Sequence, residues 1–169
     1  MARPSDRTPA TATSPRRVVR EGIMAGLAGA TVIAIWFFVI DAAAGRPLHT
    51  PATLGSALLL GATSPAGIQV TPLTVGGYTI VHGAAFITLG IIAAALVAAM
   101  ERYPPFAFAV LLLFVTFEAF FVALLAIAAA WILDTLGWAS IAAANLIAAG
   151  VMGLYLWRRH PRLRIEEAP

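Results

Sequence analysis

The sequence predicts an all-α polytopic membrane protein, a four-transmembrane-helix bundle with a short interfacial helix in its first outer loop. Of the 169 residues, 60% are hydrophobic and only 11% are charged, whereas soluble domains carry roughly 25% charged residues. The apolar residues form long runs that are almost free of charge, and a helix needs about 20 such residues to cross a bilayer. A chain of this length can form one compact membrane domain.

The first element is a tail followed by a span. Residues 1–19 are rich in Pro, Ser, Thr and Arg and have little to bury, so they are predicted to be a disordered cytoplasmic tail. The first span follows at about 20–41. A cleaved secretion signal is the alternative, because Arg16 and Arg17 precede the apolar run and small residues follow it. The run is longer than a signal core and ends in aromatic residues at 36–38, which favours a retained span.

The first outer loop, 42–75, is unusually apolar and is expected to lie on the membrane surface. Within it, Thr50 and Pro51 have the pattern of an N-cap and a first-turn proline. They predict a short helix that continues to about Leu60 and ends at Gly61. Such a helix is too short to span a membrane. It is interpreted as an interfacial helix that covers the bundle, and a substrate lid is the alternative.

Three more spans complete the predicted transmembrane domain, which covers 20–158. They lie at about 76–100, 105–133 and 138–157. The prolines at 104–105 stop one helix and start the next, and a short turn beginning at Thr135 separates the last two spans. Residues 159–169 are predicted to be a second cytoplasmic tail.

The arginines predict the orientation. Ten of the eleven fall on one side of a four-span map, and Arg46 alone falls on the other. Because cytoplasmic loops carry the excess of basic residues, both termini are expected to be cytoplasmic, in a bacterial inner membrane. The net charge of +3 therefore reports topology and does not predict nucleic-acid binding.

Glu118 is the only formal charge in the third span and lies near its middle. A carboxylate at that depth costs at least ~2.5 kcal/mol, so it should be protonated, face protein or line water. Counting along antiparallel helices at ~1.5 Å per residue places Thr31, Thr88 and Asn145 near the same depth. These four residues are predicted to form an intramembrane polar layer, which would either hydrogen-bond internally or relay protons or cations.

His82 is interpreted as the only ionisable group of the second span, and it is a candidate ligand or a candidate site of a hydrogen bond between helices. Haem or metal binding through His82 has little support, because no His-x-x-x-His or Glu-x-x-His spacing accompanies it. A second group, near the outer face, consists of Asp41, Arg46, His49 and Asp134. These residues could bind an ion or a partner, or form an ordinary interfacial charge cluster.

Small residues recur at helical spacing in every span, for example Gly22 and Gly26 in the first and Ala144 and Ala148 in the fourth. Since lipid provides no hydrophobic drive for helix association, such faces favour close packing. Part of the sequence also resembles small uncharacterised four-helix membrane proteins of bacteria. The resemblance rests on the segments at 26–30, 36–37, 41, 45–48, 50–51 and 54–55, and it implies that the turn from Gly45 to Gly55 is an architectural feature.

The sequence contains no nucleophile elbow, phosphate-binding loop or dinucleotide fingerprint, so we expect no enzymatic activity, and it indicates no cofactor. A non-catalytic subunit or scaffold of a larger membrane assembly is the leading interpretation of function. A small proton- or ion-handling protein centred on Glu118 is the main alternative, and haem or metal binding through His82 is the second. Expected partners are the lipid bilayer and other membrane proteins or further copies of the chain.

Overall fold

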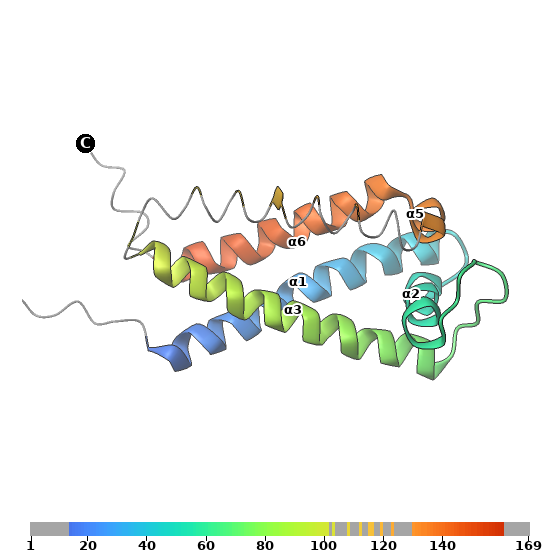
Figure 1. The fold of residues 1–169 in the computed structure, drawn as a ribbon, viewed down its shortest axis with the longest axis horizontal. Helices are drawn as coiled ribbons and strands as arrows, with labels where there is room; N and C mark the ends of the chain where they lie inside the picture. Colours follow the sequence, from blue (N-terminus) through green and yellow to red (C-terminus); the bar gives the residue numbers. More distant parts are fainter. Residues whose placement is uncertain are drawn as a thin grey trace, which may run out of the picture.

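The computed structural model describes residues 14–101, 103, 108, 112, 115, 116, 119, 123 and 130–160. This part of the chain is all-α and has five helices. They are α1 (Pro15–Ala43), α2 (His49–Leu60), α3 (Pro72–Met100), α5 (Ala130–Leu136) and α6 (Trp138–Arg159). The long helices α1, α3 and α6 run side by side, and α1 packs against both of the others (Figure 1). Helix α2 lies across one end of this group, against α3.

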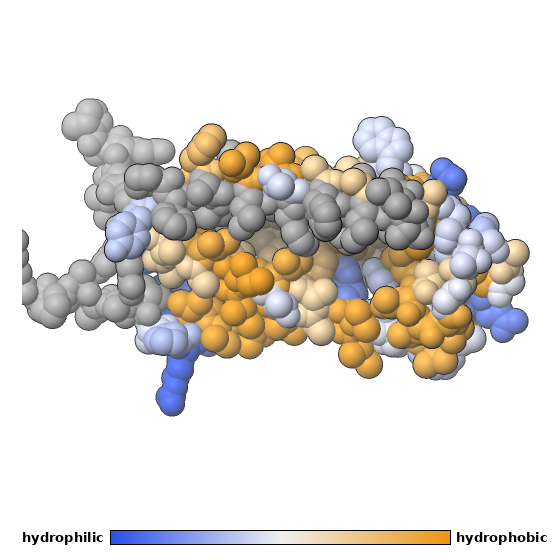
Figure 2. All heavy atoms as spheres, in the orientation of Figure 1, coloured by the Kyte–Doolittle hydropathy of each residue, from blue (hydrophilic) through white to orange (hydrophobic). Residues whose placement is uncertain are grey.

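Three helices, α1, α3 and α6, are long and apolar enough to cross a membrane. They contain the predicted spans at 20–41, 76–100 and 138–157. The predicted span at 105–133 falls mostly outside the described residues, and so does Glu118. Hydrophobic side chains dominate the face of the molecule in Figure 2, and most of the strongly hydrophilic ones lie near its two ends, as expected of helices that cross a bilayer.

Helix α1 begins at Pro15, so the prediction that residues 15–19 belong to a disordered tail was wrong. A proline in the first turn suits a helix start, because its missing N–H would have no intrahelical partner there. Arg17 also pairs with Glu21 one turn later, with 2.9 Å between Nε and Oε1. Such i, i+4 pairs stabilise helices by about 0.3–0.5 kcal/mol.

Helix α2 ends where it was predicted to end, with Gly61 in the left-handed conformation at φ +68°. Its start differs, because His49 is already helical and Thr50 is not the N-cap. The Asp41 carboxylate, at the end of α1, accepts hydrogen bonds from the Thr50 backbone N–H at 2.6 Å and from its hydroxyl at 2.8 Å. A side chain from another helix therefore caps α2.

Helix α3 begins at Pro72, four residues before the predicted position. Thr71 is its N-cap: the Thr71 hydroxyl accepts a hydrogen bond from the Thr74 N–H at 3.1 Å, and the Thr74 hydroxyl accepts one from the Thr71 N–H at 3.2 Å. This reciprocal capping box satisfies two backbone donors at once.

The turn before α6 is also shorter than predicted. Thr135 and Leu136 belong to α5, and Gly137 alone, at φ +76°, separates α5 from α6. This backbone conformation suits glycine, because a Cβ would be strained there.

Glycines bring α1 and α3 into direct backbone contact. A Cβ built on Gly26 would lie 2.7 Å from the Ile87 Cα, and one built on Gly22 would lie 2.7 Å from the Ile91 N. From the other side, a Cβ on Gly90 would lie 2.6 Å from the Gly26 N. The order of these contacts shows that α1 and α3 are antiparallel. Close approach through small residues is the packing expected for helices in lipid.

Helix α6 packs against α1 through hydrophobic side chains, alanines among them. One buried cluster consists of Ile33, Phe37, Ile141, Ala144 and Ala148, and a second, nearer the start of α1, consists of Ala25, Ala94 and Leu156. These pairings make α6 antiparallel to α1 and parallel to α3. The beginning of α1 and the ends of α3 and α6 therefore meet at one end of the molecule (Figure 1).

Candidate functional site

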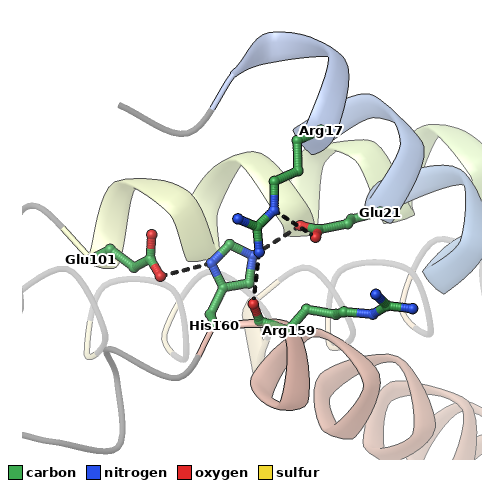
Figure 3. Close-up of polar contacts among 5 residues, drawn as sticks. All are labelled: Arg17, Glu21, Glu101, Arg159 and His160. Carbon is green, nitrogen blue, oxygen red and sulfur yellow. Dashed lines mark hydrogen bonds and ion pairs between the residues drawn. The ribbon is translucent and has the colours of Figure 1, made fainter. Parts of the chain in front are cut away.

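The meeting point of these three helix ends holds a cluster of charged side chains, which we call the ionic cluster (Figure 3). Its charged side chains are those of Arg17 and Glu21 of α1, Glu101 at the end of α3 and His160 at the end of α6, and Arg159 of α6 contributes its backbone carbonyl. His160 is 1% exposed and Glu21 is 2% exposed, so both lie inside the protein. Burial of this kind is unusual for ionisable residues unless they are paired.

His160 lies between two carboxylates from different helices. Its Nδ1 is 2.9 Å from the Glu101 Oε1, and its Nε2 is 3.2 Å from the Glu21 Oε2. The second Glu21 oxygen accepts a hydrogen bond from the Arg17 Nε at 2.9 Å. Another Arg17 nitrogen donates to the Arg159 backbone carbonyl, also at 2.9 Å.

The donors and acceptors of the cluster match when the ring is charged. Ionised carboxylates only accept hydrogen bonds, so His160 can bond two ionised carboxylates only when both of its ring nitrogens carry protons. In that state the side chains of the cluster are two anions, Glu21 and Glu101, and two cations, His160 and Arg17. Opposite charges that balance and hydrogen-bond each other are the condition under which buried ions are tolerated.

This arrangement ties helices together. Each His160 nitrogen faces a different helix end. Arg17 connects α1 to the last carbonyl of α6, that of Arg159, and carbonyls in the last turn of a helix have no intrahelical partner. Among the described residues, no group of three or more metal-binding side chains is arranged to hold a metal ion. The chemistry that the geometry supports is charge-assisted hydrogen bonding between helices.

Sequence reasoning did not identify the ionic cluster. The cluster residues Glu21, Glu101 and His160 are far apart in the chain. Each lies next to an arginine that was interpreted only as a signal of membrane orientation. One signal could have revealed them. All three occur at ends of predicted spans on the same side of the four-span map, so a list of ionisable residues by depth would have grouped them.

His82 of α3 lies against α1. Its Nε2 is 3.4 Å from the Ala30 carbonyl oxygen, which can only accept, so Nε2 carries the proton. Its Nδ1 is 3.4 Å from the Tyr78 hydroxyl, and the ring lies between those of Tyr78 and Phe86, with centroid distances of 5.4 and 4.7 Å. Both ring nitrogens therefore face protein groups. This geometry is that of the predicted interhelical hydrogen bond.

The predicted polar layer is only partly described. Thr31 and Thr88 are exposed, and each hydroxyl donates to the carbonyl four residues earlier in its own helix, at 2.8 and 2.9 Å. These bonds do not link one helix to another. Asn145 is half-buried on α6. Because Glu118 lies outside the described residues, the layer itself stays a prediction.

The residues of the predicted outer-face group have different surroundings in the structure. Asp41 is buried and bonds Thr50 through both carboxylate oxygens. Arg46 approaches Asp41 and His49 through backbone hydrogen bonds in the turn between α1 and α2. Asp134 is exposed on α5. The role that the structure gives to Asp41 is to cap α2.

Comparison with known proteins adds no assignment: no protein-family model, curated protein or solved structure matches this chain. The functional argument therefore rests on the sequence and on the geometry above.

Proposed function

We propose that the protein is a non-catalytic subunit or scaffold of a larger membrane assembly. In this proposal it is a four-span bundle of the bacterial inner membrane, with both termini cytoplasmic and α2 at the opposite membrane surface. The observation that carries the proposal is the use of the buried ionisable side chains. Glu21, His160 and Asp41 each bond a residue at the end of a helix other than their own. These side chains therefore hold helices in position.

The apolar surface supports the same proposal. In the most apolar stretch of α3, only 11% of the residues are buried within the chain, and the corresponding share is 28% in α1 and in α6. Ile80 on α3 and Leu146 on α6 are 74% and 70% exposed. A rigid frame with large outward apolar faces suits a protein that works by contact with other membrane proteins. The ion-handling alternative depends on Glu118, for which the described residues provide no further support.

Single-cysteine crosslinking can test the proposal, because the natural chain contains no cysteine. Ile80→Cys and Leu146→Cys would be labelled in native membranes with a thiol-reactive photocrosslinker, and the chain would then be isolated in mild detergent. Ala94→Cys and Ala144→Cys are matched controls on the same two helices, since both alanines are 0% exposed. We expect one or both outward positions to crosslink a membrane protein that also co-purifies stoichiometrically, and the buried positions to give no adduct.

A different result would oppose the proposal. Isolation of the chain as a lone homo-oligomer, with crosslinks only between its own copies, would contradict a role in a larger assembly. The ion-handling alternative would then become the leading hypothesis.

A further inference from the structure

The outer face of the first turns of α1 forms a shallow hollow of about 430 Å³. Its lining residues are Pro15, Arg16, Val19, Arg20, Ile23 and Met24. This face points away from the buried side of α1, which carries Glu21, Gly22 and Ala25. The hollow is therefore separate from the ionic cluster, although both lie at the same end of the helix.

The three arginines of this region have different surroundings. Arg17 bonds Glu21 and the Arg159 carbonyl. Arg16 and Arg20 are exposed and one helical turn apart, and within the described part of the chain no ion pair involves either of them. Two neighbouring guanidinium groups with free donors match the geometry of a phosphate group.

The lining of the hollow itself is almost entirely apolar, and Arg16 and Arg20 contribute mainly their aliphatic stems to it. Val19 is 44% exposed and Met24 is 51% exposed, and Ile23 lies between them on the same face. At ~1.5 Å per residue, Arg16 and Met24 are separated by roughly 12 Å along the helix axis. The surface thus changes from cationic to apolar over the distance that separates the phosphate of a phospholipid from the upper part of its acyl chains.

We propose that this hollow binds an anionic phospholipid. Arg16 and Arg20 hold the phosphate, and the acyl chain lies along Val19, Ile23 and Met24. A lipid is favoured over a soluble anion because the apolar lining belongs to a helix that is long and apolar enough to cross a membrane. Basic side chains beside a membrane span attract anionic lipids by about fivefold in affinity for each residue. The inference depends on a membrane location and does not depend on the proposed assembly partner.

Native mass spectrometry of the full chain in detergent can measure lipid binding directly. Phosphatidylglycerol and phosphatidylcholine would be titrated against the natural chain and against the double variant Arg16→Gln/Arg20→Gln. The double variant Arg46→Gln/Arg158→Gln is the matched control, because it removes the same charge from exposed positions elsewhere. A third variant, Val19→Trp, fills the hollow without changing its charge.

We expect the natural chain to prefer phosphatidylglycerol. The Arg16→Gln/Arg20→Gln variant should lose roughly 25-fold in affinity for this lipid, Val19→Trp should also weaken it, and the control should lose clearly less. An equal loss in the control would show that only overall charge matters, and this would overturn the proposal. Absence of a preference, or full competition by millimolar inorganic phosphate, would overturn it as well. Unchanged thermal unfolding of each variant would confirm that these losses do not come from misfolding.

Discussion

At the scale of single residues, polar side chains in this protein meet their hydrogen-bonding requirement in two ways. Thr31 and Thr88 bond a carbonyl of their own helix, which requires nothing from the rest of the fold. His160 and Asp41 bond other helices, so their satisfaction depends on the tertiary structure. Substitution of a side chain that bonds another helix should therefore lower stability far more than substitution of one that bonds its own helix.

His160→Leu tests this difference. The substitution leaves Glu21 and Glu101 buried or nearly buried without the cation between them, and breaking a buried ion pair costs about 3–5 kcal/mol. We expect a clearly lower midpoint of thermal unfolding in detergent. Arg158→Gln, on the exposed neighbour, should change stability by no more than about 0.5 kcal/mol.

A second substitution makes the interpretation specific. Adding Glu101→Gln to His160→Leu removes one of the two carboxylates that faced the imidazole, so part of the lost stability should return. If His160→Leu unfolds at the same temperature as the natural chain, the ionic cluster does not hold the helices together.

At the scale of helices, local sequence patterns predicted that a helix is present more accurately than they predicted the residue at which it begins. The sequence contains two Thr-Pro pairs in the outer loop, and the prediction chose Thr50-Pro51 as a helix start. The pair that caps a helix with its own side chain is Thr71-Pro72. At Thr50 the capping group is Asp41, nine positions earlier and on another helix, and a local capping pattern does not contain this information.

The contact between α1 and α3 gives a prediction at the same scale. Gly26→Ala adds a Cβ that would meet the backbone of α3 at Ile87, and backbone has no alternative rotamer. The helices must separate, which should destabilise the fold by about 1–3 kcal/mol or more. Thermal unfolding in detergent would measure the change.

Gly83→Ala is the matched control for this contact. Gly83 lies within α3, and in the described structure nothing lies within 4 Å of a Cβ built there. Because alanine is the better helix former by roughly 0.5–1 kcal/mol, this variant should be neutral or more stable. Equal destabilisation by both substitutions would show that close backbone approach is not the cause.

At the scale of the whole molecule, antiparallel packing collects helix ends into two groups. The start of α1 and the ends of α3 and α6 lie at one end, and the end of α1, α2 and the starts of α3 and α6 lie at the other. The first group carries Arg16, Arg17, Arg20, Arg158 and Arg159. This distribution agrees with the charge bias that predicts a cytoplasmic location for that end.

Topology reporters can test the orientation. A fluorescent-protein fusion after Arg159 should be active, because this end is expected in the cytoplasm. Alkaline phosphatase inserted after Ser64, in the loop between α2 and α3, should be active because that loop is expected in the periplasm. An inactive phosphatase at Ser64, together with an active phosphatase fused after Arg159, would contradict the proposed orientation and support the opposite one.

The sequence by itself determined the all-α class, the three described long apolar helices and the small-residue face of α1. These properties follow from hydrophobicity and residue size along the chain, which local sequence records. Only the tertiary structure decided which polar groups meet. The partners of His160 and Asp41 depend on how each helix is rotated about its axis, and the backbone contacts of Gly22, Gly26 and Gly90 fix that rotation. The ionic cluster could not be predicted from local sequence, because its charges come from three helices whose mutual orientation is set elsewhere in the fold.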